Sequence, residues 1–295
     1  MVRLPEDMVL PPQLMPGSPP QEPAPQGPAH PRDASTIALL RDGTGGLEVF
    51  LLHRVSGMAF AGGMTVFPGG GVDPRDAEAD LGWAGPSPSW WAGRFHTDTD
   101  TARALVCAAV RETFEECGVL LAGPTADTVV ADTTGYGQAR QALVDREYSF
   151  AQFLTREQLV LRADLVRPWA NWVTPPEEPR RYDTRFFVAA LPEGQRADGV
   201  TTEASDAGWQ TPADAVADWR EGRRGLLPPT WVTLTELGAH ADVAGALDEE
   251  RAIDVVVPRV IRDGDVLRVV LPGDERYPGA AGHLDGRPRD RLQLP

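Results

Sequence analysis

The sequence predicts an α+β domain, and three observations lead to that prediction. Two apolar runs, Thr36–Leu40 and Leu47–His53, flank a glycine-rich turn as a pair of strands would. A segment with an apolar stripe at helical spacing covers 101–117 and stops at Gly118. The chain has 295 residues, of which 42% are hydrophobic, which is enough for a sizeable core. No internal repeat or second self-contained core is visible, so we expect one elaborated domain.

Breakers, caps and apolar runs place the elements along the chain. After the strands 36–40 and 47–53 come a glycine-rich segment at 57–71, an irregular insert at 72–100, the helix 101–117 and a polar helical stretch at about 137–168. Then follow a breaker-rich loop at 169–181, a strand at 184–190, helices at 211 onward and 228–239, and a C-terminal hairpin at 255–261 and 266–271. The predicted divisions are a proline-rich tail at 1–33, a main domain at 34–240 with the insert 72–100, and a C-terminal extension at 241–295.

The proline-rich tail cannot form a strand ladder or a helix. Ten prolines lie between Pro5 and Pro31, so the segment is expected to be extended. It is either an inert tail or an arm that docks on a partner subunit, which leaves a homodimer possible.

Composition excludes several classes of partner. The net charge of −15 repels phosphate backbones, so we expect no nucleic acid partner, whereas a metal ion can bridge a small phosphorylated substrate to acidic side chains. No apolar run is long enough for a transmembrane helix, and the N-terminus has no signal-peptide pattern, so no membrane partner is expected. Only Cys107 and Cys117 are present, which excludes a disulfide scaffold and fits reduced thiols in the cytoplasm.

The segment Arg111–Val119 carries the candidate chemistry. The apolar stripe of the predicted helix 101–117 consists of Val106, Val110, Thr113, Phe114 and Cys117. Glu112, Glu115 and Glu116 then cluster on the opposite flank, where they repel one another and should raise one another's pKa. They form either a solvated acidic face or ligands for a hard cation such as Mg²⁺ or Mn²⁺. Glycines at 69–71 could let a backbone turn approach this flank closely.

These residues resemble the Nudix hydrolase family, whose box is G-x5-E-x7-R-E-U-x-E-E-x-G-U, where U is a bulky aliphatic residue. Arg111-Glu112, Glu115-Glu116 and Gly118-Val119 match its second half, and Phe67-Pro68-Gly69-Gly70 matches the strand and turn that lead into it. The resemblance covers about residues 34–240 and implies an α/β/α sandwich with a mixed sheet, here extended by a helical insert and the C-terminal hairpin.

The box is split in this chain. Arg111 follows Gly70 by 41 positions instead of the family's 14, so 41 − 14 = 27 residues are inserted. The position eight before Arg111, usually a glutamate, is Arg103. Residues that could supply the missing carboxylate are Asp73, Asp76, Glu78, Asp98 and Asp100.

A split box of this kind is similar to the subgroup of peroxisomal coenzyme A diphosphatases. Segments 168–175, 180–187 and 202–212 look like that subgroup as well. Its coenzyme A signature upstream of the glycine turn is partly present, with Leu51, Leu52, Arg54 and Gly63, although Ala59 takes the place of the second arginine.

The resemblance implies metal-dependent hydrolysis of a nucleoside diphosphate linked to another moiety, such as coenzyme A or acyl-coenzyme A. Glu112, Glu115 and Glu116 are the implied metal ligands, with Glu112 alternatively a base that orients water. Arg111 is expected to hold a ligand carboxylate in place, and Glu203 is the best candidate for a further catalytic glutamate. Gly69, Gly70 and Arg54 are expected to contact the substrate.

Several features keep alternatives open. Trp90 and Trp91 either stack on a substrate, pack the insert onto the domain or form a dimer contact. The insert is expected at the rim of the active cleft, where these tryptophans and Trp83 help close the cleft or a dimer seam. The arginines 180, 181 and 185 either grip phosphates or pair with local acids. The competing function is a catalytically inactive nucleotide-binding or scaffold module, which Arg103 at the usual glutamate position would favour.

Overall fold

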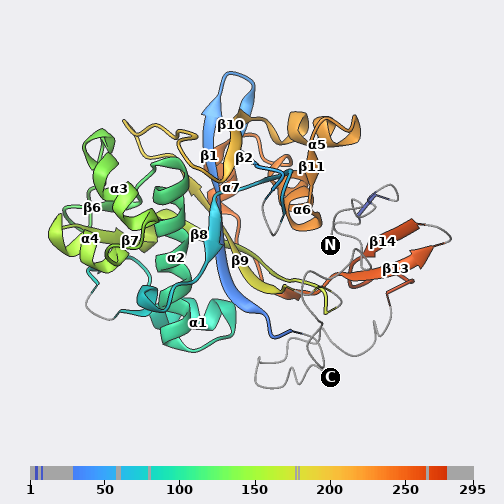
Figure 1. The fold of residues 1–295 in the computed structure, drawn as a ribbon, viewed down its shortest axis with the longest axis horizontal. Coiled ribbons are helices and arrows are strands. Elements are labelled where there is room, and N and C mark those ends of the chain that lie inside the picture. The colour runs from blue at the N-terminus through green and yellow to red at the C-terminus, as the bar shows by residue number, and fades with distance from the viewer. Residues whose placement is uncertain are drawn as a thin grey trace.

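The computed structural model describes residues 4–5, 8, 29–57, 61–78, 81–176, 178, 180–263 and 266–277. In these residues a mixed sheet forms the centre of the fold, in the order β11-β3-β2-β1-β9-β8-β12, with β4 paired to β1 and β10 paired to β2 (Figure 1). Its strands are β1 (Arg32–Gly43), β2 (Gly46–Arg54), β3 (Met64–Val66), β4 (Gly69–Gly71), β8 (Val166–Val173), β9 (Tyr182–Ala190), β10 (Ala204–Gln210), β11 (Gly225–Leu226) and β12 (Val255–Val256). β1 pairs with β9 in parallel and with β2 and β4 in antiparallel orientation.

Helices cover both faces of this sheet. The helices α1 (Pro88–Phe95) and α2 (Thr99–Cys117) lie on one face, and α5 (Pro212–Arg220), α6 (Pro228–Leu237) and α7 (Val243–Asp248) lie on the other (Figure 1). The apolar run of β1 explains this layering, because side chains along a strand alternate between faces. Ile37 and Leu39 pack in the core that contains α2, whereas Leu40 packs in the core that contains α6. The predicted α/β/α sandwich is confirmed.

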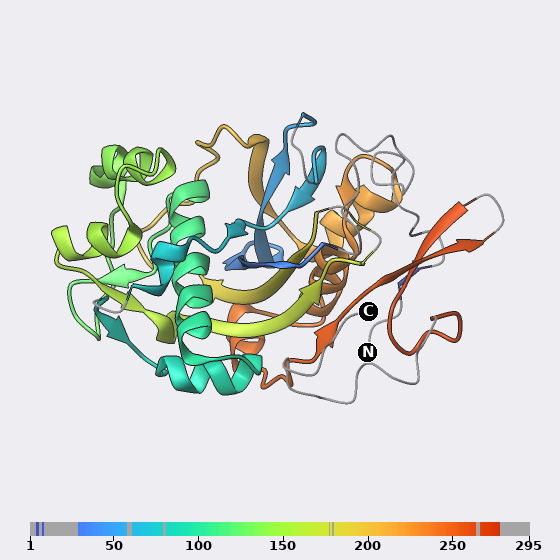
Figure 2. The same cartoon turned by 60° about the horizontal axis from the view of Figure 1, so that its bottom comes forward.

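A smaller layer packs on the outer side of α2. It contains α3 (Gly137–Val144), α4 (Phe150–Arg156) and a three-stranded sheet of β5 (Trp83–Ala84), β7 (Val160–Arg162) and β6 (Ala122–Gly123). Short 3₁₀ turns lie at Pro74–Ala77 (η2), Thr134–Tyr136 (η3) and Ala163–Leu165 (η4). The predicted C-terminal hairpin is present as β13 (Arg259–Asp263) and β14 (Val266–Val270), which projects away from the sandwich in Figure 2.

Two predicted elements are wrong. The stretch 137–168 is not helical throughout, because β7, η4 and the start of β8 occupy its last part. The breaker-rich loop predicted at 169–181 is a strand as far as Val173. Its tryptophans explain the difference, since Trp169 and Trp172 are buried in the second core and stabilise an extended backbone that the nearby prolines obscured. A bulge between Pro168 and Ala170 accommodates the proline in the ladder.

The domain boundary also differs from the prediction. Strand β1 begins at Arg32, inside the predicted tail, and most of the tail lies outside the described residues. Met8 is described and is buried in the second core. In the part of the chain that the structure describes, no helix is long and apolar enough to span a membrane. Both cysteines are buried free thiols, as predicted.

The end of α2 gives a stability test. Gly118 caps the helix at φ +73°, and a Cβ there would lie 2.9 Å from Arg140 Nη1 and 3.0 Å from Asp198 Oδ2, which form an ion pair. We expect Gly118→Ala to lower the free energy of unfolding by about 1–2 kcal/mol, the cost of a left-handed non-glycine residue.

Gly93→Ala is the matched control, because a Cβ at this position in α1 meets nothing within 4 Å. It should stabilise the protein by about 0.5–1 kcal/mol through helix propensity. Urea unfolding of both variants measures the difference, and equal effects of the same sign would contradict the assigned cap.

Candidate active site

The catalytic candidate is built where α2 crosses β4. Glu116 Oε2 accepts a hydrogen bond from the Gly69 N–H at 2.7 Å. The Glu112 carboxylate lies against Gly70, where an added Cβ would come within 2.6 Å of its atoms. Only glycine permits this approach, so the predicted closeness of the glycine turn and the carboxylate helix is confirmed.

Arg111 on α2 joins this helix to β4 and to η2 through hydrogen bonds. Its Nε and Nη2 atoms donate to the two carboxylate oxygens of Asp76, each at 3.0 Å. Nη2 also donates to the Gly71 carbonyl at 3.0 Å, and Nη1 donates to Glu112 at 2.8 Å and to Glu115 at 3.2 Å. These acids raise the pKa of Arg111 above its ordinary value against the effect of burial. Arg111 therefore holds Glu112 and Glu115 beside Asp76, which is the geometry that its predicted positioning role requires.

Asp76 provides the carboxylate that is missing at position 103, one of the five candidates that the sequence offers. It is 3% exposed and also accepts a 2.8 Å hydrogen bond from the Asp73 N–H, as part of a capping box on η2. Asp76 follows Gly70 by six positions, which is the spacing of the box's G-x5-E half. Arg103, by contrast, pairs with Asp100 at 3.2 Å two helical turns before Arg111 and does not line the cavity described below. The insertion therefore lies between Asp76 and Arg111. The spacing of six positions from Gly70 to Asp76 is the sequence signal that could have identified Asp76.

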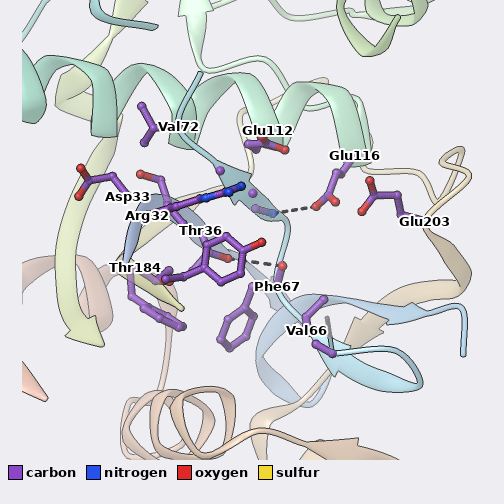
Figure 3. A pocket seen from close by; sticks show the side chains of 18 of the residues that line it. Arg32, Asp33, Thr36, Val66, Phe67, Val72, Glu112, Glu116, Thr184 and Glu203 are labelled. Carbon is purple, nitrogen blue, oxygen red and sulfur yellow. Dashed lines mark hydrogen bonds between the residues drawn. The ribbon is translucent and has the colours of Figure 1, made fainter. Parts of the chain in front are cut away.

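A cavity of about 640 Å³ opens over this arrangement. Glu112, Glu115 and Glu116 line it together with Gly69, Gly70 and Arg54. Figure 3 shows Glu112 and Glu116 projecting from α2 above β4, with Glu203 next to Glu116. Glu203 forms an ion pair with Arg54 at 2.6 Å. The fold thus brings every predicted site residue to one place, although Arg111 and Glu203 come from segments far apart in the sequence.

The site carboxylates are harder to ionise than ordinary glutamates. Burial, opposed by Arg111, raises the pKa of Glu112 to about 7. Burial also raises the pKa of Glu115, and it raises that of Glu116 well above its ordinary value, with the Glu112 charge as the second cause. The direction agrees with the sequence prediction, but desolvation and not mutual repulsion is the first cause.

The donor set fits a hard divalent cation. Oxygen ligands with buried negative charge are what Mg²⁺ and Mn²⁺ prefer, and a bound cation would offset the desolvation of these glutamates. Glu112 and Glu115 instead face the Arg111 guanidinium. Among the described residues, no three His, Cys, Asp or Glu side chains are arranged around one point as a metal site.

Some predicted features lie away from the site. Trp83, Trp90 and Trp91 do not line the cavity, so the alternative in which they help close the cleft is wrong, whereas the alternative of a dimer seam stays a prediction. Trp91 is buried in the core under α1, stacked on Phe95 with ring centroids 5.8 Å apart. Among the described residues of the insert, those that line the cavity lie at its start and include Asp73 and Asp76. Arg185 is buried and paired with Asp33 and Asp183, which supports the structural alternative for it.

Comparisons with known sequences place these features in context. Residues 95–237 match the sequence model of the NUDT19 Nudix domain. Acyl-coenzyme A diphosphatase NUDT19 of Xenopus laevis is 24% identical, over 81% of this chain and 73% of that protein. The protein of the same name from Gallus gallus is 27% identical, over 78% and 73%. Putative nudix hydrolase 7 of Caenorhabditis elegans is 30% identical, over 72% and 62%.

A solved structure shares the fold. The crystal structure of a NUDIX hydrolase from Alicyclobacillus acidocaldarius superposes with a TM-score of 0.63 at 26% identity, covering 76% of this chain and 98% of that one. This likeness agrees with the architecture described above.

The ion pair between Asp76 and Arg111 can be tested by substitution. Asp76→Asn removes one charge from a buried pair, so we expect unfolding free energy to fall by about 2 kcal/mol or more. We expect kcat to fall about 10-fold or more, because the glutamates lose an oriented neighbour. Adding Arg103→Glu, which restores a carboxylate eight positions before Arg111, should not recover either quantity. Recovery in the double variant would show that position 103 and not 76 supports Arg111.

The raised pKa values predict how the metal-free protein responds to pH. Between about pH 4.5 and 7 the folded chain keeps protons on Glu112 and Glu116 that the unfolded chain has released. Folded protein therefore binds more protons, and the contribution of these groups to stability falls as pH rises through this window. Glu116→Gln removes one of the carboxyl groups whose ionisation opposes folding, and it retains an oxygen for the Gly69 N–H.

We expect metal-free Glu116→Gln to melt at least about 3 °C above the wild type at pH 8, a shift that corresponds to about 1 kcal/mol, and close to it at pH 5. Calorimetry in the presence of a chelator measures this. The exposed substitution Glu250→Gln should give no pH-dependent difference. A lower melting temperature for Glu116→Gln at pH 8 would contradict the argument.

Proposed function

This chain belongs to the Nudix hydrolase family, and we propose that it is a divalent-metal-dependent pyrophosphohydrolase that cleaves the diphosphate of coenzyme A or an acyl-coenzyme A. The observation that carries this proposal is the meeting of Glu112 and Glu116 with the Gly69-Gly70 turn, beside Glu203. Hydrolysis of a diphosphate needs bound cations that neutralise its charge and a group that orients the attacking water. The glutamates of α2 would bind the cations, and Glu203 would orient the water.

Each residue has a role that follows from its contacts. Glu112, Glu115 and Glu116 would hold Mg²⁺ or Mn²⁺, which when bound offsets the charge that develops on the phosphates. Arg111 keeps Glu112 and Glu115 in place through its bonds to Asp76 and Gly71. The Gly69 N–H fixes one oxygen of Glu116 and leaves the other for a ligand. Glu203, half-exposed and held by Arg54, would orient the attacking water.

Cavity shape and lining support a substrate of coenzyme A type. The lining combines the carboxylates with apolar side chains, among them Trp172, Phe186, Val260 and Val269. Coenzyme A joins a charged diphosphate to an uncharged pantetheine arm, and its thioesters add an acyl chain, so a lining with both charged and apolar side chains suits this class. The curated relatives named as acyl-coenzyme A diphosphatases support the same substrate class.

The remaining assignments follow from charge and thiol content. A small phosphorylated substrate is the partner, and the net charge of −15 disfavours nucleic acid. No membrane partner is proposed, and a homodimer stays possible through the N-terminal segment. The buried free thiols of Cys107 and Cys117 are compatible with a cytoplasmic location.

The alternative of an inactive binding module loses its main argument. Arg103 at the usual glutamate position favoured it, whereas Asp76 supplies a carboxylate to Arg111 from the other side of the insertion. A retained cluster of buried acids that burial penalises also fits an active site better than a scaffold.

Activity measurements test the proposal. Coenzyme A, acyl-coenzyme A, NADH, ADP-ribose and dinucleoside polyphosphates should be compared with Mg²⁺, with Mn²⁺ and with a chelator. We expect metal-dependent release of products from coenzyme A or its thioesters, and a loss of about 100-fold or more in Glu116→Gln, since metal-assisted stabilisation is worth several kcal/mol. The exposed variant Glu250→Gln should retain wild-type turnover. Turnover in Glu116→Gln that equals the wild type at several metal concentrations would overturn the assignment.

A further inference from the structure

Two of the arginines that line the cavity have no carboxylate partner in the described part of the chain, although acidic side chains line it as well. Five arginines line it, at positions 32, 54, 75, 111 and 146. Arg54 is paired with Glu203, Arg75 with Asp73, and Arg111 with Asp76 and two glutamates. The guanidinium groups of Arg32 and Arg146 form no hydrogen bond or ion pair with any part of the chain that the structure describes.

Unpaired cations in such a place need an explanation. The chain carries 43 acidic side chains against 28 basic ones, so carboxylate partners are abundant. Arg32 is followed directly by Asp33, yet the Asp33 carboxylate accepts from the buried Arg185 at 3.1 Å. Two guanidinium groups that face a cavity without a protein partner are therefore available for an anionic ligand.

Arg146 lies at the carboxylate end of the cavity. It belongs to the turn between α3 and α4 and has a left-handed backbone, with φ +59°. Its carbonyl accepts a hydrogen bond from Arg75 at 3.5 Å, and Arg75 pairs with Asp73, whose N–H donates to Asp76, the partner of Arg111. Arg146 therefore lines the cavity beside the turn that holds Arg111. A cation in this place suits the phosphates of the diphosphate that is cleaved.

Arg32 lies at a different position along the sheet. In the pairing of β1 with β4, Ser35 is opposite Gly70, the glycine that Glu112 contacts. Arg32 is three residues further along β1, a backbone distance of about 10 Å. On its other side it is paired with Tyr182 of β9, and both residues line the cavity together with Trp172. Figure 3 shows the Arg32 side chain extending into the cavity below Glu112.

We propose that Arg146 binds the diphosphate and that Arg32 binds a separate phosphate monoester carried by the same substrate, next to a base that stacks on the aromatic side chains. Coenzyme A has such a group on its ribose, and dephospho-coenzyme A lacks it. The inference rests on the proposed function, since it names which feature of the coenzyme A class the site selects. It makes Arg32 a specificity-determining residue and Arg146 a binding residue common to all substrates.

The decisive experiment compares two substrates in matched variants. Coenzyme A and dephospho-coenzyme A are assayed with the wild type, Arg32→Ala, Arg146→Ala and the control Arg180→Ala, an exposed arginine that does not line the cavity. Arg32→Ala should raise KM about 10-fold or more for coenzyme A only, the loss expected for one charge-assisted contact. Arg146→Ala should lower kcat/KM for both substrates by the same factor, and Arg180→Ala should change neither.

Binding measurements separate this inference from the proposed function. Calorimetric titration with adenosine 3′,5′-bisphosphate and with AMP needs no turnover. The wild type should bind the bisphosphate about 10-fold tighter, and Arg32→Ala should lose that preference. Equal effects of Arg32→Ala on both ligands, or no effect on either, would overturn the role of Arg32, provided that melting temperatures show a folded variant. Failure of the wild type to hydrolyse coenzyme A would instead overturn the proposed function, while the titration still tests Arg32.

Discussion

The site depends on one ion pair, between Asp76 on η2 and Arg111 on α2. Both Arg111 nitrogens that face Asp76 are at 3.0 Å, and the aspartate is almost fully buried. The remaining donors of the guanidinium hold Gly71 of the glycine turn and two of the three glutamates. A planar group with five N–H donors in fixed geometry can join these partners at once, which a lysine could not do. The pair therefore fixes the turn, the helix and the carboxylates relative to one another.

Burial makes ionisation of the three glutamates unfavourable when no cation is bound. Desolvation raises the pKa of all three glutamates, and for Glu112 it reaches about 7 even though Arg111 opposes it. A cation that binds between them would recover electrostatic energy that water no longer supplies, which favours binding without any change of fold. Stability and function thus oppose each other here, as is common for sites whose charges are prepared for a ligand.

Most of the architecture and the site could be predicted from local sequence patterns. The apolar stripe of α2, its end at Gly118 and the glycine turn were readable because they depend on neighbours in sequence. β8 was missed because Trp169 and Trp172 are stabilised by a core that forms only in the folded chain. Arg32 and Arg146 carried no sequence signal, since a guanidinium without a partner is recognised only when every nearby carboxylate has been located.

The position of the insertion explains why the box can be split. In this chain 34 residues separate Asp76 from Arg111, where the family has 7. The added loop-closure entropy costs only about 1.4 kcal/mol, because this cost grows with the logarithm of loop length. The insert also contributes Trp91 and Phe95 to the core that α2 shares with the sheet, and burial of one such aromatic side chain contributes about 1.5–3 kcal/mol. The insertion therefore supports the helix it precedes, and the ion pair closes the loop at the two residues that the active site needs side by side.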